Sequence, residues 1–242
     1  MTKLTVVSFN THAGLHAPSG LHGCPPYDLE RVLRDFEADV IVLQEVWHPD
    51  DDVSPVEKAA AARGEELHTV SLGRAVRTDR GPRLRLPGAG RGTVSVAVLT
   101  RYPVVSGAEL PVGRVLGDPA LDRRALRLGL DVDGTTVDVV AVHLTSRLPH
   151  GPPIQMRRLR TQLPDGARPA IVAGDFNFWG PAVSALLPGW RRPVRGRTWP
   201  SHRPHSQIDH VLLGPGTEVL DAAVLDDVGS DHLPVRVTLD LR

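Results

Sequence analysis

The chain has 242 residues, of which 41% are hydrophobic, so it can bury one large core and its length does not require a second domain. Lysine plus arginine and aspartate plus glutamate each total 28, which excludes a strong net field for holding nucleic acid. A single cysteine, Cys24, excludes an intramolecular disulfide and a cysteine-based zinc cluster.

These properties predict one domain over residues 1–242 in a reducing compartment. The chain passes from Met1 almost directly into a strand-like segment, without the basic and apolar regions of a secretion signal. No apolar run approaches the roughly 20 residues that a membrane span requires. We therefore expect a cytoplasmic protein without a membrane span, and the sequence indicates no obligate protein partner.

Short segments rich in aliphatic and β-branched residues predict strands along the whole chain. They cover residues 4–9, 39–43, 93–100, 125–132, 136–143, 170–173, 208–213 and 235–239. Asp133 and Gly134 between two of these segments favour a tight hairpin, so we expect those two strands to be antiparallel neighbours.

Helical segments are fewer. Asp28 is a good N-cap for a helix over residues 29–37, and Pro152 and Pro153 open a second stretch whose residues Ile154, Leu159 and Leu163 would form an apolar face. Residues 12–27 and 71–92 are expected to be loops. Mixed sheets with few covering helices favour an α/β sandwich over a purely parallel wound sheet.

Polar residues stand at the ends of four predicted strands. Asn10 follows the first strand, and Gln44 and Glu45 follow the second. Residues 174–177 follow the strand over 170–173, and residues 230–232 precede the last strand. One such cluster is typical of a turn, but four at the rim of a sheet indicate side chains that converge on a cleft.

The residue types at these strand ends narrow the chemistry. Carboxylate and amide oxygens are the ligands that Mg²⁺ and Mn²⁺ prefer. His232 beside Asp231 supplies a cation or an acid near such a metal, and Asp209 is a candidate for holding that imidazole in one tautomer. The combination is typical of a hydrolytic site.

Six motifs follow one another from residue 8 to residue 232: Ser8-Phe9-Asn10, Leu43-Gln44-Glu45, Val142-His143-Leu144, Gly174-Asp175-Phe176-Asn177, Gln207-Ile208-Asp209-His210 and Ser230-Asp231-His232. In this order they resemble the motifs of the endonuclease/exonuclease/phosphatase superfamily, which includes deoxyribonuclease I, abasic-site endonucleases, neutral sphingomyelinases and inositol polyphosphate 5-phosphatases. The resemblance implies a deoxyribonuclease-I-like fold, a four-layer α/β sandwich of two mixed sheets flanked by helices. It also implies metal-dependent hydrolysis of phosphate esters.

The same resemblance implies a metal site. Glu45 would be the principal ligand of Mg²⁺ or Mn²⁺, and Asn10 and Asp231 would complete or support the inner shell. No other cofactor is expected.

The resemblance further implies five catalytic residues. Asp175 would orient or deprotonate the attacking water, and Asn177 would hydrogen-bond the phosphate. His232, paired with Asp209, would contact a phosphoryl oxygen in the transition state, and His143 would be a second phosphate contact or acid. Such groups stabilise the charge that builds on phosphoryl oxygens during in-line attack.

Several other residues have both a functional and a structural interpretation. Arg124 matches an arginine that relatives often carry and is a candidate substrate contact, although the neighbouring Arg123 shows that arginine is common here. His12, His16 and His22 share one loop, but their irregular spacing favours solvated residues over a zinc site.

Two arginine-rich stretches, over residues 74–91 and 191–203, are either polyanion contacts or simply solvated, and the second reading is favoured. Trp199 either stacks on a ring or base or packs beneath the site, and packing is favoured.

The sequence differs from two branches of the superfamily, and these differences narrow the predicted function. Residues 141–145 differ from the Asn-containing segment of abasic-site endonucleases, and the chain lacks the tryptophan-containing motifs of 5-phosphatases. We therefore predict a phosphodiesterase or nuclease whose partner is a phosphate-ester substrate, with nucleic acid as one candidate. A phosphomonoesterase acting on a small phosphorylated substrate is the alternative. A non-catalytic nucleic-acid-binding module is disfavoured, because it would be expected to lose some of these acids and histidines.

Overall fold

The computed structural model describes residues 2–17, 24–78, 81–84, 91–116, 122–146 and 149–241. Its strands are β1 (Thr2–Asn10), β2 (Val40–Pro49), β3 (Glu66–Thr78), β4 (Gly81–Leu84), β5 (Gly92–Thr100), β6 (Val104–Pro111), β7 (Arg124–Val132), β8 (Thr135–His143), β9 (Ala170–Asp175), β10 (Asp209–Leu213), β11 (Thr217–Val224) and β12 (Val235–Leu241). They form a larger sheet in the order β11-β12-β1-β2-β5-β3-β4 and a smaller sheet in the order β10-β9-β8-β7-β6.

Both sheets are mixed. In the larger sheet β1 runs parallel to β2, and in the smaller sheet β8 runs parallel to β9. The remaining described pairs are antiparallel, among them β7 and β8, which the hairpin at Asp133 and Gly134 was expected to join. The prediction of a mixed-sheet α/β sandwich is confirmed.

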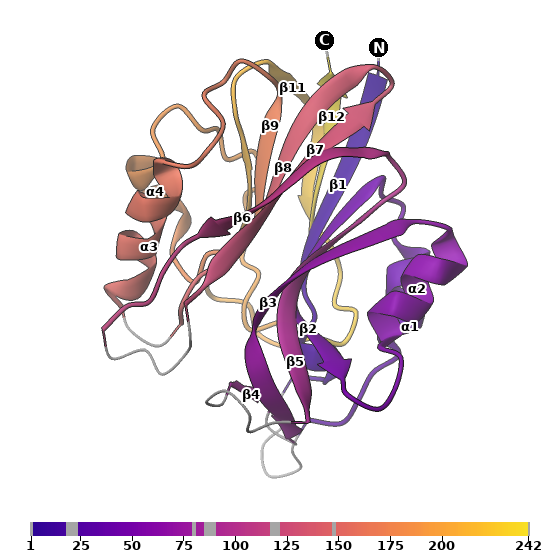
Figure 1. The fold of residues 1–242 in the computed structure, drawn as a ribbon. Coiled ribbons are helices and arrows are strands. Elements are labelled where there is room, and N and C mark those ends of the chain that lie inside the picture. Colours follow the sequence, from indigo (N-terminus) through magenta and orange to yellow (C-terminus); the bar gives the residue numbers. More distant parts are fainter. Residues whose placement is uncertain are drawn as a thin grey trace.

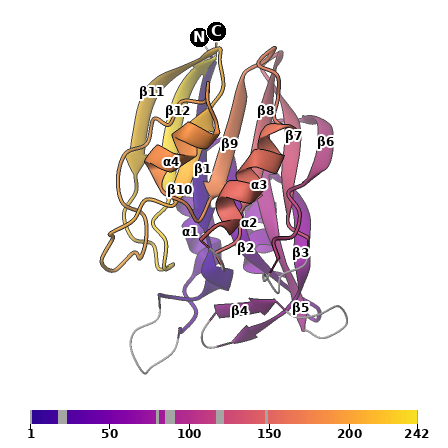
Figure 2. The ribbon, with the colours of Figure 1, turned by 90° about the vertical axis from the view of Figure 1, so that its left-hand side faces the viewer.

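Helices cover the outer face of each sheet, so the molecule has four layers (Figures 1 and 2). Helices α1 (Leu29–Asp35) and α2 (Pro55–Arg63) lie against the larger sheet, and α3 (Gly151–Arg160) and α4 (Gly180–Leu186) lie against the smaller one. A short 3-10 helix, η1 (His12–Gly14), follows β1. None of the helices in the described parts of the chain has the length and apolar character needed to cross a bilayer.

Apolar side chains pack on both faces of each sheet, between the sheets on the inner faces and beneath the helices on the outer faces. In β1, Leu4 and Val6 belong to the core between the sheets, whereas Val7 and Phe9 belong to the core beneath α1 and α2. Alternate side chains of a strand point to opposite faces, so a strand covered on both sides is apolar along its length. Each fully buried aliphatic side chain of this kind contributes about 1.5–3 kcal/mol.

Two helices were not predicted, although one carries a clear sequence signal. The side chain of Ser54 accepts from the main chain of Glu57, and the side chain of Glu57 accepts from the main chain of Ser54, which is a capping box at the start of α2. Gly64 ends the helix in a left-handed conformation. Helix α4 begins at Gly180 without a side-chain cap, so it lacks such a signal.

Other predicted boundaries need correction. The loop expected over residues 71–92 is largely wrong, because β3 continues to Thr78 and β4 follows at Gly81–Leu84. A register shift between Ser71 and Gly73 interrupts the alternation along β3 and obscured the strand. Strands β6 and β11 were also not predicted. In α3, Leu159 is buried as expected, but Ile154 is only half-buried and Leu163 lies beyond the end of the helix. The other buried residues of α3 are Gly151, Pro152, Gln155 and Met156.

Candidate active site

The strand ends that carry polar residues meet at one rim of the sandwich, away from the chain termini (Figure 1). In the larger sheet Asn10 is the register partner of Gln44. In the smaller sheet Asp175 is the partner of both His143 and Asp209. Because β1 and β9 also contact each other across the two sheets, the two sets of side chains face one space.

A pocket of about 520 Å³ opens at this rim. We call it the rim pocket, and its lining residues are His12, Glu45, Ser146, Asp175, Asn177, Trp179, Trp199, Ser206, Ile208, Asp231 and His232. The buried side chains of Asn10, His143 and Asp209 lie beneath it and contact residues of this lining. The structure therefore brings together all of the predicted metal and catalytic residues.

Backbone irregularity aims Glu45 into the rim pocket. The pairing of β2 with β5 shifts register between Leu43 and Val46, and Glu45 takes a positive φ of 52°. A side-chain-bearing residue in this region costs about 1–3 kcal/mol and persists only where its surroundings impose it. A bulge of this kind re-aims a side chain that regular alternation would point elsewhere.

Gly174 lets β9 approach β8 closely enough to place Asp175. A Cβ at Gly174 would lie 1.9 Å from the carbonyl oxygen of Val142, and its φ of 149° favours glycine. The close approach puts Asp175 beside His143, so the glycine of the Gly-Asp-Phe-Asn motif has a steric cause.

Asp175 is the most densely contacted acid of the site. Asn10 Nδ2 donates to Asp175 Oδ2 at 3.1 Å, and the main-chain N–H of Asn177 donates to Oδ1 at 2.8 Å. His143 Nε2 and His232 Nε2 lie 3.6 and 3.9 Å from Oδ2. Burial is the main cause that raises the pKa of Asp175 to about 7, so this carboxyl can take up a proton near neutral pH.

His232 and Asp209 form a buried pair. His232 Nδ1 lies 2.9 Å from Asp209 Oδ2 and 3.1 Å from Oδ1, the closeness on which the predicted role of Asp209 depends. Burial by itself lowers the pKa of His232, but the charge and hydrogen bond of Asp209 hold that pKa well above its usual value. Its ring therefore carries a positive charge at neutral pH and lines the rim pocket.

His143 differs from His232 in charge. Burial, with the nearby Arg123 guanidinium, lowers the pKa of His143 well below its usual value, so its ring is neutral at pH 7. Arg123 Nη1 donates to the carbonyl oxygen of His143 at 3.1 Å. His143 Nε2 lies 3.7 Å from Glu45 Oε1 and 3.6 Å from Asp175 Oδ2, so this ring bridges two carboxylates beneath the pocket.

The carboxylates of the rim pocket fit a divalent cation. Glu45, Asp175 and Asp231 line one space, and burial raises the pKa of Glu45, because its charge is poorly compensated there. Within the described residues, the carboxylate of Glu45 has His143 at 3.7 Å but no hydrogen bond at normal distance. Oxygen ligands of this type suit Mg²⁺ or Mn²⁺.

A second group of possible metal ligands, two aspartates and a histidine, fits a metal less well. Ligand atoms of Asp175, Asp209 and His232 lie within 4.8 Å of one another, but both oxygens of Asp209 already contact the His232 ring. The amide of Asn10 is engaged as well, since its Oδ1 accepts from the His12 main chain at 3.0 Å while Nδ2 contacts Asp175. Glu45 and Asp231 thus have the freest oxygens, and Asn10 supports them from below.

His12 was missed by the sequence interpretation, and its assignment to a solvated loop is wrong. His12 is 9% exposed and lines the rim pocket, with Nδ1 3.7 Å from Asp231 Oδ1. Its position two residues after the strand-end Asn10 was the available signal. His16 instead packs its ring against Tyr27, and His22 lies outside the described residues.

Arg124 is not brought to the rim pocket. Its guanidinium pairs with Glu109 on an exposed surface, whereas the neighbouring Arg123 is buried beside His143. Arg124 is the first residue of β7, and Arg123 lies just before the strand with its side chain turned toward the buried side.

No arginine of the two arginine-rich stretches lines the rim pocket in the described parts of the chain. Arg74 pairs with Asp50, and Arg192 is buried beside Gln207. Arg80, Arg85 and the side chain of Arg83 lie outside the described residues. Trp199 lines the rim pocket with its ring centroid 6.5 Å from that of His232, so it takes part in the pocket wall.

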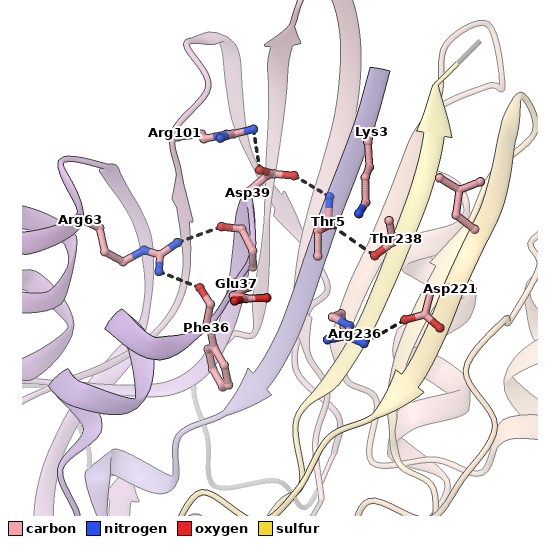
Figure 3. A pocket seen from close by; sticks show the side chains of 12 residues that line it. Lys3, Thr5, Phe36, Glu37, Asp39, Arg63, Arg101, Asp221, Arg236 and Thr238 are labelled. Carbon is pink, nitrogen blue, oxygen red and sulfur yellow. Dashed lines mark hydrogen bonds and ion pairs between the residues drawn. The ribbon is translucent and has the colours of Figure 1, made fainter. Parts of the chain in front are cut away.

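A larger trough of about 840 Å³ lies elsewhere, on the outer face of β1 and β12 (Figure 3). Most of its charged side chains already have partners. Arg101 pairs with Asp39 at 2.7 Å. Arg236 pairs with Asp221 at 2.9 Å, and Arg63 donates to main-chain carbonyl groups. Exposed ion pairs of this kind contribute little to stability, and their paired groups are not free to act on a substrate. We therefore place the candidate active site at the rim.

Comparison with known proteins gives one family match and several structures with a similar fold. The sequence profile described as the "Endonuclease/Exonuclease/phosphatase family" matches residues 7–232, whereas no curated protein matches the sequence. A similar structure is an endonuclease/exonuclease/phosphatase from Beutenbergia cavernae DSM 12333, with a TM-score of 0.76 and 24% identity, over 100% of this chain and 72% of that chain.

Two further structures share the fold. The catalytic domain of human Nocturnin with bound sulfate anion has a TM-score of 0.71 and 17% identity, over 99% of this chain and 95% of that chain. A mannosyl-6-phosphatase from Bacteroides thetaiotaomicron VPI-5482 has a TM-score of 0.66 and 16% identity, over 98% of this chain and 100% of that chain.

Proposed function

The chain belongs to the endonuclease/exonuclease/phosphatase family, and from this premise we propose that it is a divalent-metal-dependent hydrolase of phosphodiesters. One observation carries the proposal. Asp175, a buried carboxyl whose pKa burial raises to about 7, faces the same pocket as the cationic His232 and the acids Glu45 and Asp231. A proton acceptor, a cation and a set of oxygen ligands around one space are what hydrolysis at phosphorus requires.

Glu45 and Asp231 would hold the metal, with Asn10 as a supporting residue. When bound, Mg²⁺ or Mn²⁺ would supply Lewis-acid stabilisation of charge on phosphoryl oxygens. The raised pKa of Glu45, caused by its burial, supports this assignment, because a nearby cation would offset the buried negative charge.

Asp175 would accept the proton of the attacking water. Its hydrogen bonds from Asn10 and Asn177 fix the orientation of the carboxylate, and its pKa of about 7, raised by burial, matches a base that works near neutral pH. The side chain of Asn177 donates through Nδ2 to the Leu144 carbonyl at 3.0 Å, which holds the amide at the pocket wall. The second Nδ2 hydrogen would reach the phosphate.

His232 would stabilise the charge that builds on a non-bridging oxygen. Asp209 holds its Nδ1, so Nε2 is the nitrogen that faces the pocket. His143 is neutral at pH 7, because burial lowers its pKa, and it contacts carboxylates rather than lining the pocket. We therefore assign His143 to the support of Glu45 and Asp175 rather than to direct contact with phosphate.

The charge of the pocket favours diesters over monoesters. Neither lysine nor arginine occurs among the lining residues identified in the described structure, and His232 is their principal cation. A monoester dianion carries one more negative charge than a diester and would need further cations. One structural neighbour is named a mannosyl-6-phosphatase, so a monoesterase remains the competing function.

The test is hydrolysis of bis(4-nitrophenyl) phosphate and 4-nitrophenyl phosphate with Mg²⁺, with Mn²⁺ and with excess EDTA. We expect the diester to be cleaved faster, and EDTA to abolish cleavage. Glu45→Gln should raise the metal concentration needed for half-maximal rate by about 10- to 100-fold, because one ligand charge is lost. Glu66→Gln, at an exposed acid paired with His68, is the matched control. Full activity in EDTA would refute the metal requirement, and faster monoester cleavage would refute the diester assignment.

A second prediction concerns Asp209 as a positioning residue for His232. Asp209→Asn removes the charge that raises the His232 pKa, so burial should then bring that pKa down. The protonated ring is present below its pKa and lost above it. The alkaline limb of the kcat profile should therefore move to lower pH, with a loss of about 10- to 100-fold at neutral pH.

The measurement is kcat against pH for wild type and Asp209→Asn, with Asp221→Asn at the exposed Arg236 pair as control. A merely structural role would lower kcat by the same factor at every pH and leave the limb in place. That outcome would remove Asp209 from the mechanism.

A further inference from the structure

Trp179 presents an indole ring to solvent beside the candidate active site. It is 67% exposed, and it is the one aromatic residue among the exposed large hydrophobic side chains of the described chain. The ring is nevertheless held in place, because it stacks on Phe178 with centroids 6.4 Å apart and planes 6° from parallel. His210 Nε2 lies 2.9 Å from the Phe178 carbonyl oxygen, which anchors the same segment.

A second pocket of about 450 Å³ begins at this ring. We call it the Trp179 pocket. Its lining residues are Trp179, Gly180, Pro181, Arg192, His205, Ser206 and Gln207. Trp179 and Ser206 also line the rim pocket, so the two pockets adjoin and share a wall. A group attached to a phosphate in the rim pocket can therefore reach the Trp179 pocket.

Arg192 gives the Trp179 pocket a fixed positive charge. Its side chain is 8% exposed, and Nη1 donates to Gln207 Oε1, while Gln207 Nε2 donates to the Val194 carbonyl at 3.0 Å. The guanidinium lies against Gly180, where a Cβ would come within 2.2 Å of Nη1. Any larger residue at position 180 would displace it, so the absence of a side chain there creates room for the charge.

We propose that the Trp179 pocket binds a nucleobase carried by the phosphodiester that is cleaved in the rim pocket. The substrates would be nucleotide esters or the unpaired ends of single strands. The inference rests on the proposed phosphodiesterase function and adds the substrate class to it. An indole face stacks on any base, and such stacking contributes about 1–3 kcal/mol per base.

The lining distinguishes a base from other groups. Arg192, His205 and Ser206 offer polar atoms around the indole, which suit the hydrogen-bonding edges of a flat heterocycle. An acyl chain would need apolar walls, and Trp179 is the main large apolar side chain of this pocket. A base inside a duplex is already stacked on its neighbours, so the pocket selects unpaired bases.

The test compares three diesters with the same leaving group. Two are the 5′ and 3′ isomers of thymidine 4-nitrophenyl phosphate, and the third is methyl 4-nitrophenyl phosphate. Trp179→Ala should lower kcat/KM for the better thymidine isomer by about 5- to 100-fold. The loss for the methyl ester should be clearly smaller, because this ester places no base in the Trp179 pocket and can be affected only through the wall that Trp179 shares with the rim pocket. Trp179→Phe should retain most of the preference, and Leu220→Ala, at an exposed residue of the outer trough, should retain all of it.

A binding measurement makes the inference independent of turnover. Thymidine 5′-monophosphate should quench tryptophan fluorescence in wild type and bind more weakly to Trp179→Ala, whereas 2-deoxyribose 5-phosphate should bind both proteins equally. If no diester is cleaved but this difference holds, the proposed function fails and the base-binding pocket stands. If diesters are cleaved and Trp179→Ala affects neither the thymidine substrate nor nucleotide binding, the inference is overturned. Equal losses for the thymidine and methyl diesters would place the nitrophenyl ring in the pocket and also overturn it.

Discussion

Replacement of Asp175 by asparagine is expected to lower kcat by about 10²- to 10⁴-fold while leaving the fold intact. The amide cannot accept a proton from water. In wild type, Asn10 Nδ2 donates to Asp175 Oδ2 at 3.1 Å. In the variant, the new amide would either place its own N–H group against this donor or rotate by 180° to avoid it. Substrate binding should suffer less than turnover, because proton transfer occurs only in the transition state.

The measurement is kcat and KM for the diester at saturating metal, with thermal unfolding of the variant recorded in parallel. Asp165→Asn, at an exposed acid that contacts the main chain of Ala167, is the matched control and should keep full activity. Turnover within tenfold of wild type, with unchanged metal dependence, would mean that another group activates the water.

Replacement of His232 by alanine is expected to lower kcat by about 10²- to 10³-fold. The ring supplies the principal cation of the pocket lining, and its loss leaves Asp209 buried without its partner. The affinity for Mg²⁺ or Mn²⁺ should remain close to that of wild type, because Glu45 and Asp231 are unchanged. His68→Ala, which removes a half-buried histidine paired with the exposed Glu66, is the control.

Turnover and metal binding separate the outcomes for His232. A large loss of kcat with normal metal affinity supports charge stabilisation by the imidazolium. Parallel losses of kcat and of metal affinity would instead assign His232 to the metal site. Normal turnover would exclude it from both.

Much of the site was predictable because its residues occur in motifs at strand ends. Asn10, Glu45, Asp175 and His232 were each identified from short polar segments that follow or precede apolar ones. Strand ends of parallel neighbours meet at one edge of a sheet, so local sequence predicted a long-range cluster. His12 was missed because a histidine within a loop has no periodicity that reveals its burial.

Errors in the fold prediction have local causes as well. The strand β3 passes through Gly73, where a register shift breaks the alternation that predicts strands. Helix α2 was overlooked despite the capping box of Ser54 and Glu57, since its alanine-rich sequence has little contrast between faces. The capping residues, and not the hydrophobic pattern, were therefore the signal that could have predicted this helix.

The sequence by itself determined the family, the mixed-sheet sandwich and the identity of the acids and histidines at the rim. Only the tertiary structure decided their states. Burial lowers the pKa of both His143 and His232, and their neighbours separate them: Asp209, 2.9 Å from the His232 ring, raises the pKa of that ring, whereas Arg123 lowers the pKa of His143 further. The Trp179 pocket likewise exists only where α4 and the segment before β10 meet. Proton affinity and cavity shape depend on groups far apart in the chain, so no local pattern encodes them.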